Sequence, residues 1–303
     1  MFKKQMKHVY PDYYPRFQCI AGKCRHSCCV GWEIDIDADT LAAYRQMDDA
    51  LGERLRRNID ADGAGAHFRL DAQERCPFLN RAGLCEIILE KGERALCQIC
   101  ADHPRFRSCF SDREEMGLGL CCEAACELIL RRREPVRFLT EGEEMLMPEE
   151  AAFLSWRDAM IALAQDRSRF VAERMERILA ACGRKLPACT PREWAQAFLQ
   201  LECMDEAWTT RLLALDGKAP FPAPDEIALE QLLVYFLYRH LPAGFEAGDV
   251  GGYAAFAVHS VRMIASLARD DHDLLEVARL YSAEIEYSDE NVQVLVEAIQ
   301  ANA

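Results

Sequence analysis

The sequence lacks the features that mark membrane, fibrous and repeat proteins. No apolar run approaches the ~18 residues that a membrane-spanning helix needs. The opening residues, MFKKQMKHVYPDYYPRF, contain basic side chains but no apolar signal segment. Glycine (16 residues) and proline (12 residues) occur at ordinary frequency, and we find no internal repeat. These absences predict a soluble, globular, cytoplasmic protein that neither spans nor binds a membrane.

The net charge is -14, and the acidic excess lies mainly in the second half of the chain. Residues 1–130 hold 18 basic and 21 acidic side chains, whereas residues 131–303 hold 18 and 29. An acidic surface repels nucleic acid and attracts cations. We therefore expect no nucleic-acid partner. A lysine-bearing protein suits this charge, although such acidity also serves ordinary solubility.

Cysteine is the residue that the sequence has in excess. Of 15 cysteines, 12 lie between Cys19 and Cys126. This density indicates disulfides in a small secreted domain, but metal or redox chemistry in a cytosolic protein. The odd count and the adjacent pairs Cys28–Cys29 and Cys121–Cys122 do not suit a disulfide framework. The sequence therefore favours a metal-binding protein.

Residue composition and hydrophobic spacing change along the chain, and this change predicts a mainly α protein with two domains. Residues 1–130 are rich in loops and cysteine, with few short strands and a helix expected over 40–57 after Asp37 or Asp39. Residues 131–150 form a charged linker or crossing segment. Residues 151–303 form an all-helical domain. Amphipathic spacing predicts helices at 149–166, 167–182, 191–203, 205–215, 226–241, 252–270, 271–286 and 289–301.

The spacing of the cysteines indicates where a metal would bind. Four thiols within eleven residues can converge on one site when the backbone loops around it. A downstream group containing a C-x2-C pair completes that site or forms a second one. A third group, Cys121, Cys122 and Cys126, opens a helix. The predicted metal ligands are Cys19, Cys24, Cys28 and Cys29, with Cys76, Cys85, Cys97 and Cys100.

Spacing does not separate zinc from an iron–sulfur cluster, because both are held by four thiolates. The thiols greatly outnumber four, and the zinc-finger spacing of cysteine with histidine is absent. These two facts favour an iron–sulfur cluster, of the four-iron type, over zinc. His26 and His103 lie close to the cysteines in sequence, and each is expected to be a surface residue or to support a ligand, with replacement of a thiol as the alternative.

Several segments of the chain resemble the flagellin lysine-N-methylase family, which shares its cysteine-rich region with zinc- or iron-chelating cysteine-cluster proteins. The similarity spans most of the chain, and its cysteine segments are the most distinctive part. The segments that carry it are YYPRFQCIAGKCRHSCCVGWEIDID (13–37), CPFLNRAGLCEI (76–87), GERALCQICADHPR (92–105), LCCEAACELIL (120–130), YFLYRHL (235–241) and YSAEIEYSDEN (281–291).

The resemblance implies transfer of a methyl group from S-adenosylmethionine to lysines of flagellin, with a cysteine-bound metal in the enzyme. Motifs do not locate the donor pocket, since the chain has neither a G-x-G strand-to-helix turn nor C-x3-C-x2-C. Aromatic rings suit the donor's sulfonium, and arginine suits its carboxylate. The predicted donor-binding residues are Tyr14, Trp32, Arg105 and Arg239. The catalytic residues are unassigned.

Two other classes of function fit the same cysteines. A metal-chelating carrier or sensor would need no donor pocket and would expose its ligands. An electron-transfer protein would hold its cluster near the surface. Binding of S-adenosylmethionine separates the methyltransferase from both.

Overall fold

The computed structural model describes residues 6–61, 65–142, 145–215 and 225–301. The chain forms two compact units that interleave along the sequence. We call one the cysteine unit, which consists of Gln18–Arg105 and Cys122–Ala124. We call the other the helical unit, which consists of Met1–Phe17, Phe106–Cys121 and Ala125–Ala303. The secondary structure confirms a mainly α protein with few short strands and a helical carboxy-terminal region.

The cysteine unit is built from short elements. It contains α1 (Ala38–Gln46), α2 (Ala50–Arg57), the hairpin β2 (Ile59–Ala61) and β3 (Ala66–Phe68), α3 (Glu86–Lys91) and α4 (Gln98–Asp102).

The single helix predicted over 40–57 is wrong, because the chain breaks it between α1 and α2. Asp37 caps α1, and its carboxylate accepts a hydrogen bond from Thr40 N at 2.9 Å. Asp49 caps α2 in the same way through Gly52 N, also at 2.9 Å. An aspartate that can start a new helix therefore interrupts an otherwise continuous apolar period.

The core of the cysteine unit combines aromatic rings with thiols. The rings of Tyr44 and Phe68 stack at 6.3 Å, and those of Phe68 and Phe78 lie 5.2 Å apart. Cys76 and Cys97 are buried in the same apolar cluster. The thiols are therefore part of the packing of this unit as well as candidates for chemistry.

Apart from Arg105, the helical unit contains the whole of a four-stranded sheet of β1 (Lys7–Pro11), β4 (Arg105–Cys109), β5 (Arg113–Leu118) and β6 (Phe138–Glu141). The strand order is β4-β5-β1-β6, with β1 parallel to β5 and antiparallel to β6. In β6, the segment expected to be a linker pairs with the strand nearest the amino terminus.

The remaining helices include the series predicted over residues 149–301 and one earlier helix. They are α5 (Glu123–Leu130), α6 (Pro148–Ala164), α7 (Val171–Ala181), α8 (Pro191–Phe198), α9 (Glu206–Ala214), α10 (Glu226–Glu246), α11 (Val250–Leu267), α12 (Asp271–Tyr281) and α13 (Asp289–Ala301). A π-helical turn, Ser282–Glu286, follows α12 directly.

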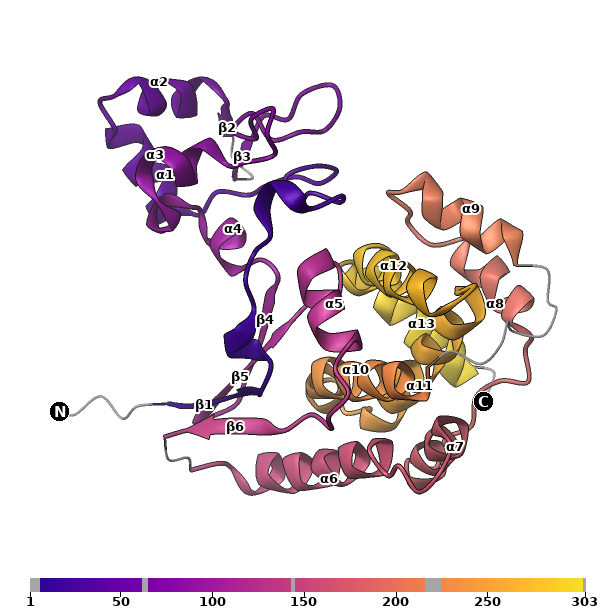
Figure 1. Cartoon of the computed structure of the whole chain (residues 1–303). Coiled ribbons are helices and arrows are strands. Elements are labelled where there is room, and N and C mark those ends of the chain that lie inside the picture. Colours follow the sequence, from indigo (N-terminus) through magenta and orange to yellow (C-terminus); the bar gives the residue numbers. More distant parts are fainter. Residues whose placement is uncertain (1–5, 62–64, 143–144, 216–224, 302–303) are drawn as a thin grey trace. The chain divides into compact units, whose positions relative to one another are not determined.

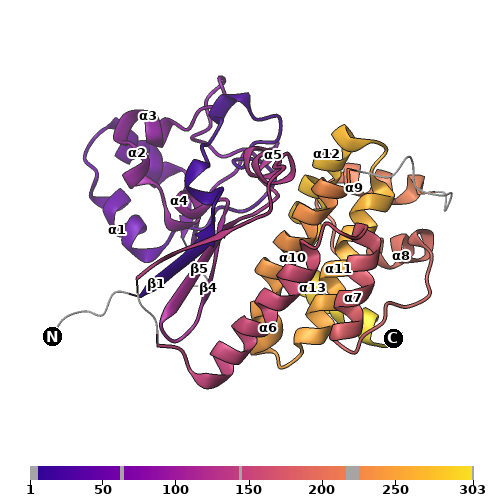
Figure 2. The same ribbon diagram turned by 60° about the horizontal axis from the view of Figure 1, so that its bottom comes forward.

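Helix α10 is the centre of the helical unit and packs against α6 and α11, while α11 also contacts α13 (Figures 1 and 2). Tyr238 on α10 ties this helix to the sheet, since its hydroxyl donates to Val9 O at 3.1 Å or Met116 O at 3.2 Å. No helix in the described ranges has the length and apolar content required to cross a bilayer.

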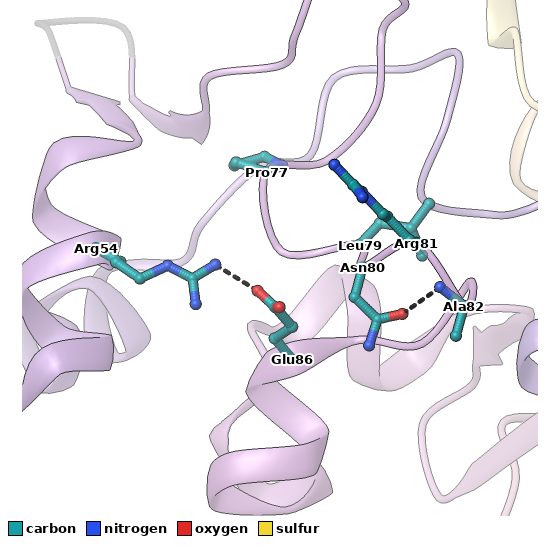
Figure 3. Close-up of a pocket in the computed structure, with 7 residues that line it drawn as sticks. All are labelled: Arg54, Pro77, Leu79, Asn80, Arg81, Ala82 and Glu86. Atoms are coloured by element: carbon teal, nitrogen blue, oxygen red, sulfur yellow. Dashed lines mark hydrogen bonds and ion pairs between the residues drawn. The ribbon is translucent and has the colours of Figure 1, made fainter.

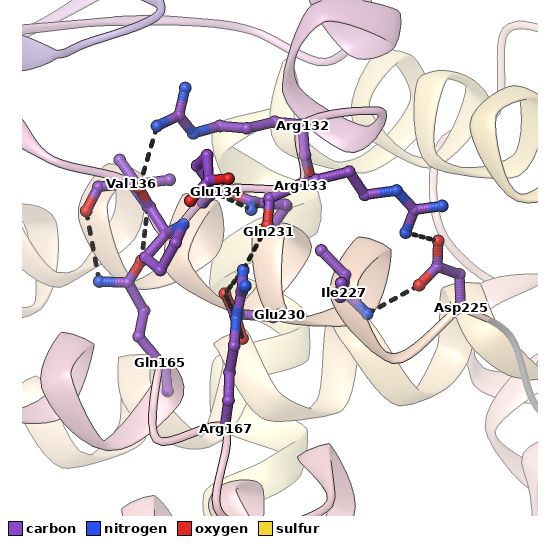
Figure 4. Close-up of polar contacts among 12 residues, drawn as sticks. Arg132, Arg133, Glu134, Val136, Gln165, Arg167, Asp225, Ile227, Glu230 and Gln231 are labelled. Carbon is purple, nitrogen blue, oxygen red and sulfur yellow. Dashed lines mark hydrogen bonds and ion pairs between the residues drawn. The ribbon is translucent and has the colours of Figure 1, made fainter.

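Hydrogen bonds hold the first part of the predicted crossing segment to the helices (Figure 4). Arg167 donates to the Arg133 carbonyl at 2.7 Å and pairs with the buried carboxylate of Glu230. Gln231 donates to the Glu134 carbonyl at 3.0 Å. The segment is therefore an integral part of the helical unit.

Candidate functional site

The thiols of the cysteine unit fall into two sets. The first, which we call the outer set, consists of Cys19, Cys24, Cys28 and Cys122. The pKa of Cys24 is raised to about 11, first by burial and then by the neighbouring thiols Cys122 and Cys19. The pKa of Cys28 is also raised, chiefly by its hydrogen bond with Cys29 and by burial, with Cys19 and Cys122 adding to it. These side chains therefore lie close enough together to interact electrostatically.

The second set, which we call the inner set, consists of Cys29, Cys76, Cys85, Cys97 and Cys100. All five are buried in the apolar core of the unit or packed against it. Burial raises the pKa of Cys76 to about 12, with contributions from Cys29, Cys85 and Cys97. The Cys97 and Cys100 thiols are hydrogen-bonded to each other, which lowers the pKa of Cys97 and raises that of Cys100.

Backbone N–H groups point at several of these sulfur atoms. Such bonds run from Ala21 to Cys19, at 3.3 Å, from Phe78 to Cys76, from Ile87 and Ile88 to Cys85, and from Cys100 to Cys97. Each donor lies two or three residues after its cysteine. These bonds favour the thiolate over the thiol, and thiolate is the form that binds metal.

The donor chemistry of both sets suits a soft metal ion or an iron–sulfur cluster. Thiols that raise one another's pKa would repel as thiolates, and a bound cation removes that repulsion. Within the described residues, no group of three or more His, Cys, Asp or Glu side chains has an arrangement that would hold a metal ion.

The sets differ from the groups seen in the sequence. Cys29 packs with the inner set although its thiol is hydrogen-bonded to that of Cys28 in the outer set, and Cys122 acts on Cys24 from about a hundred residues further along the chain. Sequence reasoning did not assign Cys122 as a ligand. Its only signal was its place in the Cys121–Cys122–x3–Cys126 group. That group is itself divided, since the Cys126 thiol lies 3.3 Å from the Leu275 carbonyl in the helical unit.

Trp32, His103 and Arg105 are further predicted residues of the cysteine unit. Trp32 donates from Nε1 to the Cys28 carbonyl at 2.8 Å, and its ring lies 6.4 Å from that of His103. The pKa of His103 is lowered to about 4 by burial and by the charge of Arg105. Arg105 Nη1 donates to the Ala101 carbonyl at 3.4 Å.

A shallow depression lies on the loop that joins Cys76 to Cys85 (Figure 3). Its lining includes Arg81 and the ion pair between Arg54 and Glu86. Asn80 shapes the loop, because its Oδ1 accepts hydrogen bonds from Ala82 N and Leu84 N at 2.9 and 3.0 Å. The polar groups here stabilise the loop between two inner-set cysteines.

The helical unit contains a buried polar network around Glu286. The Glu286 carboxylate accepts from the Tyr235 hydroxyl at 3.0 Å, lies 2.6 Å from His240 Nε2 and pairs with Arg239 Nε at 3.4 Å. Arg239 Nη1 also donates to the Tyr235 hydroxyl, at 2.7 Å. Burial opposes ionisation of Glu286, but Arg239 and His240 bring its pKa below the ordinary value.

Three segments that carry the family resemblance meet at this network. Tyr235 and Arg239 come from YFLYRHL, and Glu286 comes from YSAEIEYSDEN. The backbone N–H of Leu120, the first residue of LCCEAACELIL, donates to the Tyr235 hydroxyl at 3.3 Å. Cys121 follows at once, and its thiol is hydrogen-bonded to the Tyr287 side chain.

The guanidinium of Arg239 is surrounded by aromatic rings as well as by Glu286. Its carbon lies 5.0 Å from the centre of the Phe106 ring, 4.9 Å from that of Tyr287 and 5.9 Å from that of Tyr235. This environment suits a cation. The predicted role of Arg239 in holding a donor carboxylate stays a prediction, and Glu286 is the carboxylate that it binds in this structure.

Tyr14, the remaining predicted donor-binding residue, lies in the helical unit beside the sheet. Its hydroxyl lies 3.7 Å from Met116 Sδ, and its ring lies 5.5 Å from that of Tyr10. The four predicted donor-binding residues are therefore divided between the units: Tyr14 and Arg239 belong to the helical unit, Trp32 and Arg105 to the cysteine unit.

Comparison with known proteins finds relatives in Salmonella. The chain is 27% identical over 133 residues to a lysine-N-methylase of Salmonella typhimurium, a match covering 42% of this chain and 33% of that protein. It is 26% identical over 156 residues to the flagellar biosynthetic protein FliU of Salmonella muenchen, covering 50% and 87%. The match thus spans about a third of the lysine-N-methylase. No family model and no solved structure matches the chain.

Proposed function

We propose that this chain is a protein-lysine N-methyltransferase that acts on flagellin, uses S-adenosylmethionine and carries a cysteine-ligated metal centre. The similarity to proteins named Lysine-N-methylase is the observation that carries the proposal. The flagellar name of a third relative supports flagellin as the substrate. The acidic net charge of -14 suits a lysine-bearing partner.

The proposed reaction has a simple balance. The neutral Nζ of the substrate lysine forms a bond to the methyl carbon of the sulfonium, and the bond between sulfur and that carbon breaks. The electron pair of the broken bond returns to sulfur, which leaves S-adenosylhomocysteine, and the lysine nitrogen loses a proton to a base. The enzyme must therefore lower the lysine pKa or supply the base, and must stabilise a cation.

The helical unit offers chemistry that suits a cation. Glu286 is buried, its pKa is lowered by Arg239 and His240, and the guanidinium of Arg239 lies over the rings of Phe106 and Tyr287. The exposed residue of this group is Tyr287, at 48% of its possible surface. We propose that this side of the network borders the path of the cationic substrate.

The cysteine unit offers the ligands for the metal. We propose an iron–sulfur cluster of the four-iron type in preference to zinc, since nine thiols lie in this unit. A bound centre would supply either a structural crosslink or electrons. The N–H groups that point at the sulfurs would tune its properties.

The runner-up is a metal-chelating or iron–sulfur protein without methyltransferase activity. Partial coverage favours it, because the match reaches a third of the named lysine-N-methylase. The predicted cytoplasmic location suits both functions.

The experiment that separates the two starts from protein purified without oxygen. Bound iron, sulfide and zinc are measured, together with calorimetric binding of S-adenosylmethionine. The proposal predicts a metal centre together with donor binding that S-adenosylhomocysteine competes away. Metal without donor binding would establish the chelating alternative, and donor binding without metal would remove the metal centre from the proposal.

A further inference from the structure

We propose that the depression on the loop between Cys76 and Cys85 binds the α-amino-acid end of the methyl donor, with Arg81 holding the carboxylate and Glu86 the ammonium group. The inference rests on the proposed function and adds a place for the donor. The four donor-binding residues predicted from the sequence are divided between the two units, whereas the lining of the depression lies entirely within the cysteine unit.

Arg81 is an exposed side chain at the tip of a well-bonded loop. Asn80 N donates to the Leu84 carbonyl at 3.0 Å, and Gly83 N donates to the Asn80 carbonyl at 3.0 Å. In Figure 3 no interaction joins the Arg81 guanidinium to the other residues that line the depression. In the part of the chain that the structure describes, this side chain makes no hydrogen bond or ion pair. The loop therefore presents a cation that is available to a ligand.

Glu86 supplies the opposite charge in the same depression. Its Oε2 pairs with Arg54 Nη2, while Arg54 Nη1 lies 3.9 Å from Glu90 Oε1 and the guanidinium carbon lies 5.4 Å from the centre of the Phe78 ring. Arg54 is thus fully engaged. Among the described residues Glu86 Oε1 accepts no hydrogen bond, and the side chain is 29% exposed. One carboxylate oxygen is therefore left for an incoming ammonium group.

Asn80 adds a donor to the lining. Its Oδ1 accepts from Ala82 N and Leu84 N, so its Nδ2 is the part of the amide that is left for a ligand. Pro77 and Leu79 contribute apolar surface. The depression has a volume of about 590 Å³, which lies in the range of small-molecule sites. It opens to solvent, so a ligand longer than an amino acid can extend out of it.

The two available charges suit an α-amino acid better than a simple ion. A guanidinium binds a carboxylate through two parallel N–H···O bonds, and an ammonium group donates to a carboxylate oxygen. An α-amino acid carries both of its charged groups on one carbon and so presents them together. In the proposed reaction the donor carries such an end, whereas the methyl group leaves from its sulfonium. Arg81 and Glu86 are therefore positioning residues that hold the donor away from the reacting atoms.

Calorimetry on the whole protein, purified without oxygen, tests the assignment with three ligands. S-adenosylmethionine carries the complete donor, methylthioadenosine lacks the amino-acid end, and methionine lacks the adenosine. For the wild-type protein we expect S-adenosylmethionine to bind more tightly than either fragment.

The variant R81A then removes the proposed carboxylate partner. We expect the affinity for S-adenosylmethionine to fall by about tenfold or more, since a hydrogen-bonded pair of charges is lost, while the affinity for methylthioadenosine stays unchanged. R81K should recover only part of the loss, because an ammonium group cannot form the paired bonds of a guanidinium. R45A, which removes an exposed arginine of the same unit outside the depression, is the matched control and should bind all three ligands as the wild type does.

E86Q should show the same selective loss. It also breaks the pair with Arg54, so R81A, which removes no contact within the described residues, decides. Unchanged binding of S-adenosylmethionine by R81A would place the donor elsewhere, although the methyltransferase proposal stands. An equal loss for methylthioadenosine would show that Arg81 does not hold the amino-acid end.

Two further results concern the ligand itself. If methionine binds in a way that depends on Arg81 but S-adenosylmethionine does not bind, the site takes a free amino acid and the donor assignment is wrong. If none of the three ligands binds to folded wild-type protein with its full metal content, both this inference and the proposed function fail.

Discussion

The hydroxyl of Tyr235 lies 3.0 Å from the Glu286 carboxylate, and this hydrogen bond joins α10 to the π-helical turn after α12. A π-helical turn replaces the regular hydrogen bonds of an α-helix with wider ones, and such turns occur frequently at functional sites. Here the turn ends at Glu286, which is fully buried and paired with Arg239. The pair connects segments that lie about fifty residues apart in sequence.

Replacing Tyr235 by phenylalanine should destabilise the protein. The change removes the hydroxyl that bonds Glu286, Arg239 and Leu120 N, and leaves buried polar groups without that partner. We expect a loss of about 1–3 kcal/mol in the free energy of unfolding, measured by urea denaturation. Y253F, at a partly buried tyrosine of α11, is the matched control. Equal stability of the two variants would contradict a bonded network.

Replacing Glu286 by glutamine should cost more. The variant keeps the shape of the side chain but leaves Arg239, whose side chain is 11% exposed, without its counter-charge. Breaking one side of a buried ion pair typically costs about 3–5 kcal/mol. The control is E290Q, an exposed position in α13. If E286Q unfolds at the same urea concentration as E290Q, Glu286 is not the counter-ion.

Acid should weaken the helical unit through His259. Burial, assisted by Arg262, lowers the pKa of His259 to about 3, whereas a histidine in an unfolded chain titrates near pH ~6.5. Between those values unfolding takes up a proton, so stability falls as the pH is lowered. The slope expected from this group is about 1.4 kcal/mol per pH unit. H259N should reduce the slope, while H272N, at an exposed position, should leave it unchanged; equal slopes would refute the assignment.

Removal of metal should loosen the cysteine unit and spare the helical unit. Metal-binding energy becomes folding energy when the ligands come from separate loops. After treatment with a strong chelator, hydrogen exchange should accelerate in peptides covering 66–100 and remain slow in α11 (250–267). Slow exchange in both regions after complete metal loss would show that the thiols stabilise the unit through packing alone.

The sequence predicted the helices of the carboxy-terminal half because amphipathic spacing is a local signal. Helix capping is an equally local signal: the Thr190 and Ser288 hydroxyls each accept a hydrogen bond from the backbone N–H three residues on. The helix expected over 40–57 failed locally, since Asp49 starts a second helix within the apolar period.

The tertiary arrangement of the candidate site was harder to predict, because it depends on contacts between residues far apart in the sequence. Cys122 reaches the outer set only because the chain returns to the cysteine unit for three residues. Tyr235, Arg239 and Glu286 meet through the packing of α10 against the turn after α12, which no spacing rule encodes. Cys28 and Cys29 look like one group in sequence, and their thiols are hydrogen-bonded, although Cys29 also packs with the inner set.

The most direct test of the central claim is transfer of a labelled methyl group to flagellin. Protein purified without oxygen is incubated with purified flagellin and isotopically methyl-labelled S-adenosylmethionine, and flagellin peptides are examined by mass spectrometry. We predict labelled methyl groups on lysine side chains that require both the protein and the donor. Flagellin that stays unlabelled, with a protein that carries its full metal content and is folded, would contradict the proposed function.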